Sequence, residues 1–402
     1  MEQKLILIIG GGKEAVPGII HLQNNGYKIL VTDKSINSPS KKIANYFIKS
    51  SIYNISQTIK KIIKFNEKYK IHAVLSLSAD VPLTVAKCAK VLGLNSMPIN
   101  TAKIFSNKLL MKKFFKKNNI NTPYFKSISS LKKLKSIIKK NKEYVIKPID
   151  NRGARGVLKF NLNNDISKFY KETKKNTKLN KIILEEYIEG QQLSTETVIY
   201  NGKVVTVGVS DRNYDKLKEF SPYIIENGSD LPSIYHRNYI TKINNLIKKI
   251  AKKSGITNGS LKGDLVIYKK KIYVVEIAAR LSGGYFSSKM IPEYNGFNLI
   301  KKVAEIYLGN KVDISKKNVQ KKFISQRFFF PKVGKIKSIK IPKWIKKSKN
   351  LVYFELNASK GDTIKNIKNH TDRVGQIIVK SKNRKNSKNI INKMIKSVVF
   401  KY

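Results

Sequence analysis

Strands and helices alternate through the first hundred residues, and this order limits the folds that the chain can adopt. The segments that read as strands are KLILIIG, YKILVTD and HAVLSLS, and those with helical spacing are AVPGIIHLQNNG, SQTIKKIIKFNEKY and VPLTVAKCAKVLG. Such alternation predicts a parallel sheet with helices on its faces. Ligands of these sheets bind beside the carboxyl ends of the strands. We therefore predict an α/β layer with a ligand-binding edge over residues 1 to 100.

The length and composition indicate a soluble protein of several domains. A chain of 402 residues is too long for one ordinary core and fits two or three domains. No apolar run reaches the roughly 18 residues of a membrane helix, and none resembles a secretory signal. Cys88 is the single cysteine, so no internal disulfide forms. These features lead us to expect a cytoplasmic protein.

The net charge of +55 invites a nucleic-acid interpretation, which the kind and spread of the basic residues disfavour. Only 8 of the 81 basic residues are arginine, and the lysines are scattered among isoleucine and asparagine. This pattern is typical of a coding bias that covers every solvated surface. A polyanion-binding protein is kept as the non-enzymatic alternative, and no specific nucleic-acid partner is expected.

Beyond residue 100 the pattern changes to longer helices and strand pairs. TAKIFSNKLLMKKFFKKNN reads as one amphipathic helix. A compact unit is expected over about 124–190, followed by strand-rich segments on either side of the helix YITKINNLIKKIAKKSG. A lysine-rich, strand-rich segment that begins QKKFISQRFFFPKVGKI predicts a smaller carboxy-terminal domain.

The glycine turn near the amino terminus has two interpretations. Gly10, Gly12 and Ala15 fit the dinucleotide pattern G-x-G-x-x-G/A, and Asp33 ends the next strand. Read alone, the turn suggests NAD and an oxidoreductase. The alternative is that it only packs a strand against a helix, or that it contacts another substrate.

A lysine followed by a glycine loop suggests a phosphate site in YVIKPIDNRGARGV. Lys147 leaves a buried strand, and Gly153 and Gly156 allow close backbone approach to phosphate oxygens. Arg152 and Arg155 add charge. The alternative is an ordinary hairpin whose lysine reaches solvent.

Two acids in GDLVIYKKKIYVVEIAARLSGG suggest a metal site. Asp264 and Glu276 lie on two strands joined by a polar turn, so a hairpin brings both carboxylates together as oxygen ligands for hard cations. Arg280 follows and suits the charge that develops in phosphoryl transfer. A surface hairpin with acids at its rim is the alternative.

The segment ILEEYIEGQQ adds a strand that ends in acids and is followed by a glycine turn, a pattern typical of a contact with adenine and ribose.

In this order, these motifs together with Lys108 in SNKLLMKKFF resemble the ATP-grasp superfamily, and they are most similar to the group of biotin carboxylase, carbamoyl phosphate synthetase and the L-amino acid ligases. The segment KGDTIKNIKNHTDRVGQIIV resembles the end domain of ligases in that group. The resemblance implies an α/β ATP-grasp fold. Its parts would be a Rossmann-like (pre-ATP-grasp) domain over 1–103, an ATP-grasp domain over 104–310 with a mobile α+β lid over about 124–190, and a small carboxy-terminal domain over 311–402.

The resemblance also implies roles for individual residues. The phosphates of ATP would be contacted by Lys108, Lys147, Gly153 and Gly156, the adenine by Glu185, Glu186 and Ile188, and the ribose by Gln192. Magnesium, or manganese in its place, would be bound by Asp264 and Glu276, and the acyl phosphate would be stabilised by Arg280. The acceptor substrate would be bordered by Ser282, Gly283, Gly284 and Tyr285. The glycine loop would close over the phosphates and exclude water.

Two positions depart from the family pattern. Gln192 replaces an acid, which a neutral hydrogen bond to ribose tolerates. Ala278 stands where many members have a metal-binding asparagine, so a second magnesium would be held less completely, and a scaffold that binds ATP without turnover is an alternative.

The resemblance implies an ATP-dependent ligase that joins a small carboxylate to an amine or related nucleophile through an acyl phosphate, and a homodimer is considered. Bicarbonate is the alternative carboxylate, as in the carboxylases and carbamoyl phosphate synthetase. The chain lacks a biotin-carrier segment and a second synthetase half, which favours an amino acid or another metabolite.

Overall fold

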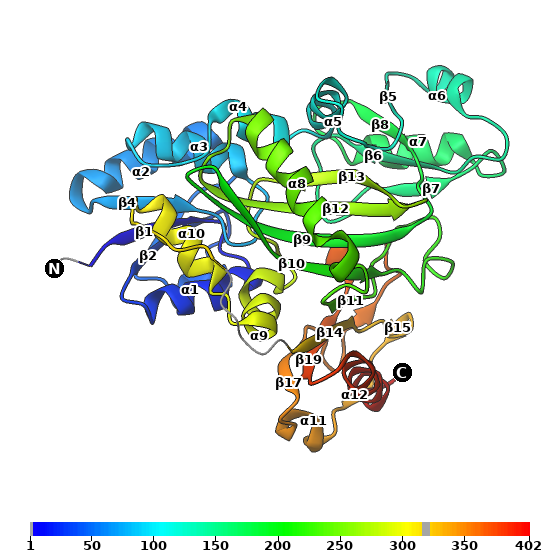
Figure 1. Cartoon of the computed structure of the whole chain (residues 1–402). Coiled ribbons are helices and arrows are strands. Elements are labelled where there is room, and N and C mark those ends of the chain that lie inside the picture. The colour runs from blue at the N-terminus through cyan, green and yellow to red at the C-terminus, as the bar shows by residue number, and fades with distance from the viewer. Residues whose placement is uncertain (1–2, 316–321) are drawn as a thin grey trace.

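The computed structural model describes residues 3–315 and 322–402, and it folds around three main sheets, one of eight strands and two of four strands (Figure 1). The amino-terminal sheet lies at one end, a small sheet lies at the opposite end, and a long central sheet runs between them and on into the carboxy-terminal segment. Residues 316–321, which fall in the expected carboxy-terminal domain, lie outside the described residues.

The first sheet is parallel, as the alternation of strands and helices predicts. Its strand order is β3-β2-β1-β4. The bounds are β1 (Leu5–Ile9), β2 (Lys28–Asp33), β3 (Tyr46–Lys49) and β4 (Ile71–Leu75), with helices α1 (Val16–Gln23), α2 (Ile55–Lys68) and α3 (Pro82–Val91) and the short turns η1 (Lys13–Ala15) and η2 (Pro39–Lys42). Every residue of β1 is buried, because it is an inner strand covered on both faces.

The single helix expected at TAKIFSNKLLMKKFFKKNN is wrong, because the structure breaks it in two. α4 (Ile99–Phe105) ends at Ser106, and α5 (Lys108–Lys117) begins after Asn107. Asn107 is extended, with φ −133° and ψ 115°, and its side chain accepts hydrogen bonds from the backbone N–H groups of Leu109 and Leu110. Asparagine is a favoured helix N-cap, so it starts a new helix where the apolar periodicity continues. The break puts Lys108 in the first turn of α5.

The small sheet has the order β5-β8-β6-β7 and is antiparallel. Its strands are β5 (Phe125–Ile128), β6 (Tyr144–Pro148), β7 (Leu158–Phe160) and β8 (Ile182–Glu186), with helices α6 (Leu131–Ile137) and α7 (Ile166–Lys175). Its own apolar core includes Ile146, Leu158 and Leu184. The glycine loop connects β6 to β7 and therefore projects from one end of this sheet.

The central sheet has the order β13-β12-β9-β10-β11-β14-β19-β17. Its strands are β9 (Gln191–Tyr200), β10 (Lys203–Asn213), β11 (Gly228–Leu231), β12 (Gly259–Tyr268), β13 (Lys271–Ala278), β14 (Phe323–Phe328), β17 (Leu351–Leu356) and β19 (Gly375–Ser381), and α8 (His236–Ser254) packs on it. The carboxy-terminal strands β14, β19 and β17 join this sheet, because β14 pairs with β11.

The segment after the last expected ATP-grasp motif packs back onto the amino-terminal layer. The elements there are η3 (Phe286–Met290), α9 (Ile291–Asn295) and α10 (Leu299–Tyr307). Ile300 and Val303 share one apolar core with Ile6 and Ile19 (Figure 1). The first and central sheets are held together by this buried apolar surface.

The remaining elements are β15 (Gly334–Lys335), β16 (Ser338–Lys340), β18 (Thr363–Ile364), β20 (Val399–Lys401), α11 (Lys343–Lys347), α12 (Arg384–Ser397) and η4 (His370–Asp372). These short strands pair separately as two two-stranded sheets, β15 with β18 and β16 with β20.

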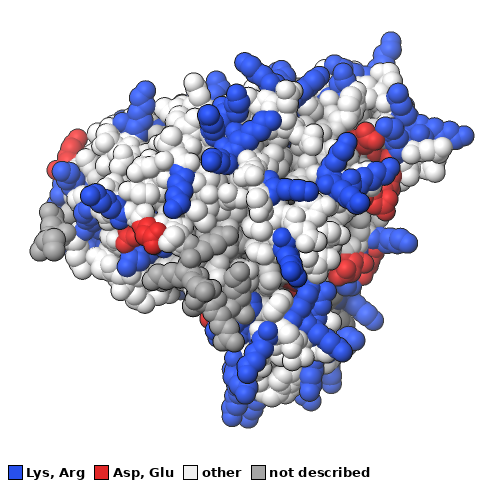
Figure 2. Space-filling model, in the orientation of Figure 1, with Lys and Arg blue, Asp and Glu red and all other residues white. Residues whose placement is uncertain are grey.

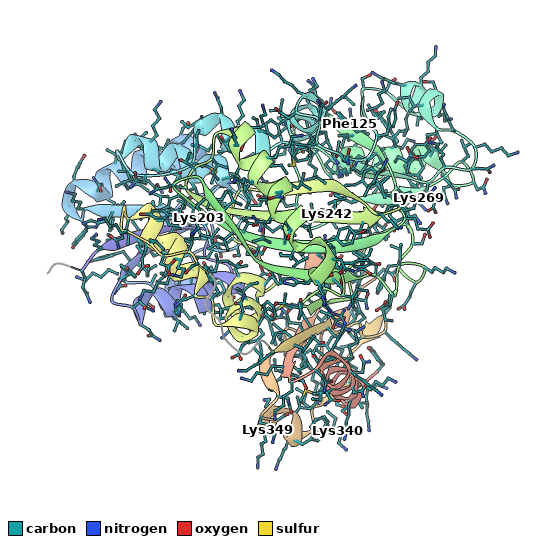
Figure 3. All side chains as sticks on the ribbon, viewed as in Figure 1. Phe125, Lys203, Lys242, Lys269, Lys340 and Lys349 are labelled. Atoms are coloured by element: carbon teal, nitrogen blue, oxygen red, sulfur yellow. The ribbon has the colours of Figure 1, made fainter. Side chains whose placement is uncertain are left out.

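Basic side chains are spread over the whole face shown in Figure 2, without one continuous stripe. The lysines labelled in Figure 3 are exposed and come from separate parts of the fold: Lys203, Lys242, Lys269, Lys340 and Lys349. Across residues 3–315 and 322–402, no helix is both long enough and apolar enough to span a bilayer.

The cap at Asn107 gives a stability prediction. Asn107→Ala removes the acceptor for two backbone N–H groups, so the free energy of unfolding should fall by about 1 kcal/mol. Urea denaturation measures it. Asn245→Ala is the matched control, since Asn245 is exposed within α8 and alanine suits a helix interior. An equal loss in both variants would show that the cap contributes nothing.

Candidate active site

A cavity of about 650 Å³ lies where the three sheets meet, and most of the predicted site residues line it. Among the residues predicted for the site, those at its wall are Lys108, Lys147, Gly153, Glu185, Glu186, Ile188, Gln192, Asp264, Glu276, Arg280, Ser282, Gly283, Gly284 and Tyr285. Gly156 does not line it and instead packs against Asn176 and Pro148. The structure therefore brings together segments that are as much as 177 residues apart in the sequence, from Lys108 to Tyr285.

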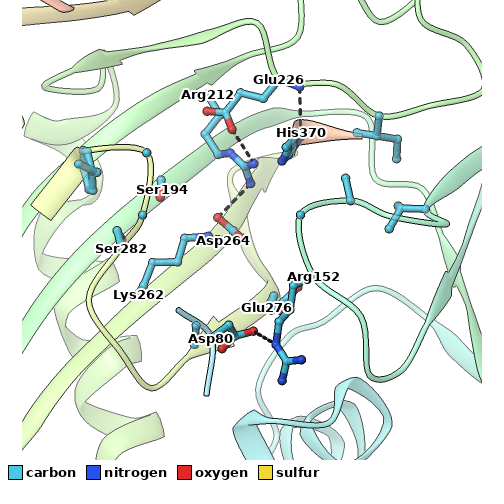
Figure 4. A pocket seen from close by; sticks show the side chains of 18 of the residues that line it. Asp80, Arg152, Ser194, Arg212, Glu226, Lys262, Asp264, Glu276, Ser282 and His370 are labelled. Carbon is cyan, nitrogen blue, oxygen red and sulfur yellow. Dashed lines mark hydrogen bonds and ion pairs between the residues drawn. The ribbon is translucent and has the colours of Figure 1, made fainter. Parts of the chain in front are cut away.

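The hairpin of β12 and β13 places the two predicted metal ligands opposite each other. Asp264 pairs in register with Glu276, as the polar turn between the strands predicts. Arg212 Nη1 lies 2.9 Å from Asp264 Oδ1, and Lys262 also forms an ion pair with this carboxylate (Figure 4). Burial alone would raise the pKa of Asp264, but Arg212 and Lys262 lower it to about 2. The carboxylate is therefore ionised at any ordinary pH.

Two lysines of the cavity wall are neutralised by acids from other elements. Lys108 Nζ lies 3.3 Å from Glu276 Oε1 and donates to the Asn151 carbonyl at 2.8 Å. Lys147 Nζ lies 2.7 Å from Glu185 Oε1, and both side chains are buried. A buried charge is tolerated only when it is paired. These pairs hold cations ready at the wall of the cavity.

Sequence reasoning missed Lys112, which stands behind this wall. Its Nζ lies 3.2 Å from Glu185 Oε2 and donates to Thr122 Oγ1 at 2.7 Å. Burial lowers the pKa of Lys112 to about 8, against the opposing effect of Glu185. Its spacing of four residues from Lys108 on one helix was the available signal. Glu185 thus meets two ammonium groups, and its carboxylate faces them.

The cavity also has apolar residues at its wall, among them Ile188, which is expected to contact adenine. These apolar residues are Pro123, Val145, Ile188, Val266 and Val275. Glu186 is paired with Lys142 at 2.9 Å, nearer the outside. Gln192, on β9 of the central sheet, lines the same cavity. Apolar residues with a few polar groups suit an aromatic base.

The glycine loop contacts the carboxy-terminal segment. Gly153 has φ +65° and its carbonyl accepts a hydrogen bond from the His370 N–H at 3.0 Å. The Cβ that Gly153 lacks would lie 3.6 Å from a methyl group of Thr371. Glycine suits this left-handed backbone. The loop thus rests on the 3₁₀ turn η4 (His370–Asp372).

The carboxy-terminal segment supplies cavity residues that the sequence did not predict. His370 and Arg373 line the cavity together with Glu226 and Arg212. The Glu226 N–H donates to His370 Nε2 at 3.4 Å, and burial beside two arginines holds the pKa of His370 well below its usual value, so the ring is neutral (Figure 4). Arg373 stacks on Phe328 with its Cζ 3.6 Å from the ring centre.

The loop after β13 is fixed by a buried carboxyl group. Glu196 Oε2 accepts hydrogen bonds from the Ser282 N–H at 3.2 Å and from Ser287 Oγ at 3.0 Å. Burial raises the pKa of Glu196 to about 7, and these hydrogen bonds oppose the shift. Tyr285 adopts φ 61° and its hydroxyl contacts that of Tyr353 at 2.9 Å. The predicted acceptor loop therefore has a defined backbone.

The amino-terminal glycine turn is filled by the chain itself. The Gly11 N–H donates to Asp33 Oδ2 at 3.0 Å, and the Gly11 carbonyl accepts from Ser38 Oγ at 2.6 Å. A Cβ on Gly11 would lie 2.3 Å from Ser38 Oγ. Asp33 and the turn are thus occupied by internal hydrogen bonds, which favours the packing interpretation over NAD binding.

The carboxylate pair Asp264 and Glu276 fits a hard divalent cation. Carboxylate oxygens are the ligands that Mg²⁺ prefers, and Mg²⁺ in phosphate sites uses one or two of them beside phosphate oxygens. Ala278 offers a methyl group and no oxygen. Within residues 3–315 and 322–402, no three acids, histidines or cysteines gather as a group that could hold a metal ion.

Family models match two parts of the chain. An ATP-grasp domain matches residues 105–284, and the L-amino acid ligase C-terminal domain 2 matches residues 327–402. A D-alanine–D-alanine ligase of Wolbachia pipientis subsp. Culex pipiens is 37% identical over 109 residues, which is 27% of this chain and 33% of that protein. The match therefore spans about a third of that relative.

Solved structures share the fold over nearly the whole chain. The L-amino acid ligase from Bacillus licheniformis has a TM-score of 0.84 at 18% identity and covers 100% of this chain and 99% of its own. The phosphoribosylglycinamide synthetase from Anaerococcus prevotii has a TM-score of 0.77 at 20% sequence identity, and the match covers 100% of both chains. A third similar structure is the biotin carboxylase domain of the Hydrogenobacter thermophilus 2-oxoglutarate carboxylase, in complex with MgADP, ADP and bicarbonate. Its TM-score is 0.75 at 15% sequence identity, and the match covers 100% of this chain and 91% of that one. These likenesses confirm the predicted fold class.

Glu196 gives a pH prediction. Because burial raises the pKa of Glu196 in the folded state to about 7, above its ordinary value of 4.5, the folded state binds more protons between these pH values, and stability falls as pH rises through them. Glu196→Gln mimics the protonated form. At pH 8 the free energy of unfolding of the variant should be about 3 kcal/mol higher than that of the natural protein, and at pH 4 the two values should be equal. Urea midpoints measure both, and a variant that is less stable at pH 8 would contradict the prediction.

Proposed function

Since this chain is a member of the ATP-grasp superfamily, with its ATP-grasp domain at residues 105–284, we propose that it is an ATP-dependent ligase. It joins a small carboxylate to an amine through an acyl phosphate and releases ADP and phosphate. The observation that carries the proposal is the convergence of phosphate-binding cations and a carboxylate pair on one cavity. The sequence match to the L-amino acid ligase carboxy-terminal domain supports an amino acid as a substrate.

The cations suit the triphosphate of ATP. Lys108 and Lys147 come from α5 and β6 and line the same cavity as the glycine loop. Backbone N–H groups of the loop and the two ammonium groups offer donors to phosphate oxygens. The lysines are paired with Glu276 and Glu185 at 3.3 and 2.7 Å, so no buried charge is left unpaired before ATP binds.

Asp264 and Glu276 would hold Mg²⁺, or Mn²⁺ in its place. The ion supplies neutralisation of charge on the phosphate oxygens during transfer. The base of ATP would lie against the apolar lining at Ile188, with the ribose near Gln192. In this arrangement Arg280, at the end of the same hairpin, faces the γ-phosphate region.

The two chemical steps follow from this placement. A carboxylate oxygen of the first substrate attacks the γ-phosphorus, the bond to the ADP oxygen breaks, and Arg280 stabilises the charge on the transferred group. The ammonium group of the second substrate gives one proton to solvent, and the resulting amine attacks the acyl carbon. The bond from acyl carbon to phosphate oxygen breaks, phosphate leaves with the electron pair, and the nitrogen loses its second proton to the departing phosphate. The glycine loop keeps water from the acyl phosphate.

Two unpaired carboxylates in the cavity support an amine as the second substrate. Glu14 and Glu355 line the cavity, and no lysine or arginine of residues 3–315 and 322–402 forms an ion pair with either. Glu355 accepts one hydrogen bond, from Gln376 at 3.2 Å. In a chain with 81 basic residues, free carboxylates inside a cavity suit an ammonium ligand. Bicarbonate, present in the biotin carboxylase structure, is the second candidate carboxylate.

We include in the proposal a cytoplasmic location and small-metabolite substrates. A homodimer is part of it as well, and the carboxylase domain of similar fold is described as a dimer.

Removal of a phosphate contact or a metal ligand should abolish turnover. Lys147→Ala and Glu276→Gln are each expected to lower kcat/KM for ADP release by a factor on the order of 100 or more, because each removes a charge that faces the transferred phosphoryl group. A coupled assay of ADP release measures kcat/KM. It contains Mg-ATP with amino acids, singly and in pairs, or with bicarbonate. Lys140→Ala, an exposed lysine of the same sheet unit, is the control. Undiminished release in both variants would refute the assignment.

The acyl phosphate should be trapped by hydroxylamine. With Mg-ATP and the carboxylate substrate alone, added hydroxylamine should yield the hydroxamate in an amount equal to the ADP released, because this uncharged nucleophile takes the place of the amine. A colorimetric iron assay and mass spectrometry detect the product. ADP release with amide formation, but without any hydroxamate, would point to a path that avoids the acyl phosphate.

A further inference from the structure

We propose that Asp80 is a positioning residue that holds Arg280 and Arg152 toward one point of the cavity, so that docking of the glycine loop and orientation of Arg280 depend on the same carboxylate. The proposal rests on the proposed function, since it takes Arg280 as the group that stabilises the transferred phosphoryl group. It assigns a second role in the cavity to the amino-terminal layer, which also supplies Glu14.

Asp80 stands at the carboxyl edge of the first sheet, in the loop between β4 and α3. The loop is held by a hydrogen bond from Ser76 Oγ to the Ala79 carbonyl at 2.5 Å. Behind it lies the glycine turn, where a Cβ on Gly10 would approach the Ala79 Cβ to 2.7 Å. Gly10 has φ +96° and no side chain, so the two loops pack closely. The glycine turn thus supports the position of Asp80.

One carboxylate meets two arginines from different elements. Asp80 Oδ2 lies 3.1 Å from Arg152 Nε of the glycine loop (Figure 4), and Asp80 Oδ1 lies 3.5 Å from Arg280 Nε after β13. The Asp80 side chain is 11% exposed. It is therefore the point at which the amino-terminal layer, the glycine loop and the central hairpin meet.

The remaining contacts orient the guanidinium groups. Arg280 Nη1 donates to the Leu281 carbonyl at 2.9 Å, and Arg152 Nη1 donates to the Asp150 carbonyl at 3.4 Å. The Nε side of each arginine faces Asp80, which leaves the Nη2 group of each without a hydrogen bond among the described residues. Because an arginine binds phosphate through such free N–H groups, the arrangement presents both to a ligand.

The charge of Asp80 is essential to this arrangement. Burial alone would raise its pKa, but Arg280, Arg152 and Lys108 outweigh burial and lower it. The carboxylate is therefore ionised while the enzyme works. Arginine side chains have much rotamer freedom, and a fixed counter-ion removes it before the reaction starts. An asparagine keeps the shape of Asp80 but loses the charge that holds both guanidinium groups.

The test separates positioning from binding by kinetics. Asp80→Asn should lower kcat for ADP release by a factor on the order of 10 to 100, while KM for ATP changes less than about threefold, because ATP contacts other residues. Asp80→Glu should restore part of kcat. Arg152→Gln should also lower kcat, and the double variant Asp80→Asn with Arg152→Gln should be little slower than Asp80→Asn alone, since the two residues act as a unit.

Glu293→Gln is the control. Glu293 joins two distant segments by an ion pair with Lys380 at 3.0 Å but does not line the cavity, so this variant should keep the natural kcat. Multiplicative effects of Asp80→Asn and Arg152→Gln, or an Asp80→Asn variant with natural kcat, would overturn the proposal.

A second measurement needs no turnover. In the full chain with Mg²⁺ and a non-hydrolysable ATP analogue, hydrogen exchange of the backbone over 150–157 should be faster in Asp80→Asn than in the natural protein, because the loop loses its contact with the first layer. Equal exchange overturns the proposal. If the natural chain releases no ADP with any substrate, the proposed function fails, and this exchange result still decides whether Asp80 docks the loop.

Discussion

Pairing of the central cavity cations with carboxylates from other elements is the interaction on which the site depends. Lys108 meets Glu276, Lys147 meets Glu185, Arg212 meets Asp264, and two arginines meet Asp80. Each pair joins segments far apart in the chain. A cation left alone in such a cavity would have to give up its charge or draw in water. The pairs let the protein gather positive charge at one place before any anion arrives.

This pairing also explains how a chain with a net charge of +55 keeps a defined site. Most lysines stand in solvent on every part of the surface, where salt screens them. Inside the cavity, the few acids are placed where the cations are. Glu14 and Glu355 are the exceptions at the cavity wall, and their unpaired state is the reason we assign them to a cationic ligand.

The carboxylate pair and the glycine loop could be placed from the sequence, because local rules govern them. A polar turn between two strands fixed the register of Asp264 with Glu276, and glycine spacing fixed the loop after Lys147. The break before Lys108 was missed. Apolar periodicity runs through both helices, and only the N-cap at Asn107 separates them. Lys112 was missed for a related reason, since its burial depends on Glu185, more than seventy residues away.

The sequence by itself determined the parallel first layer, the strand pairs and the residue types that face phosphate, because periodicity and turn chemistry act over short distances. Tertiary structure alone decided that Asp80 lies between two arginines, that His370 supports the glycine loop, and that Ser38 fills the amino-terminal turn. These contacts join residues whose separation in the chain carries no signal. They form because burial of charge and of apolar surface is settled only when the distant segments have packed together.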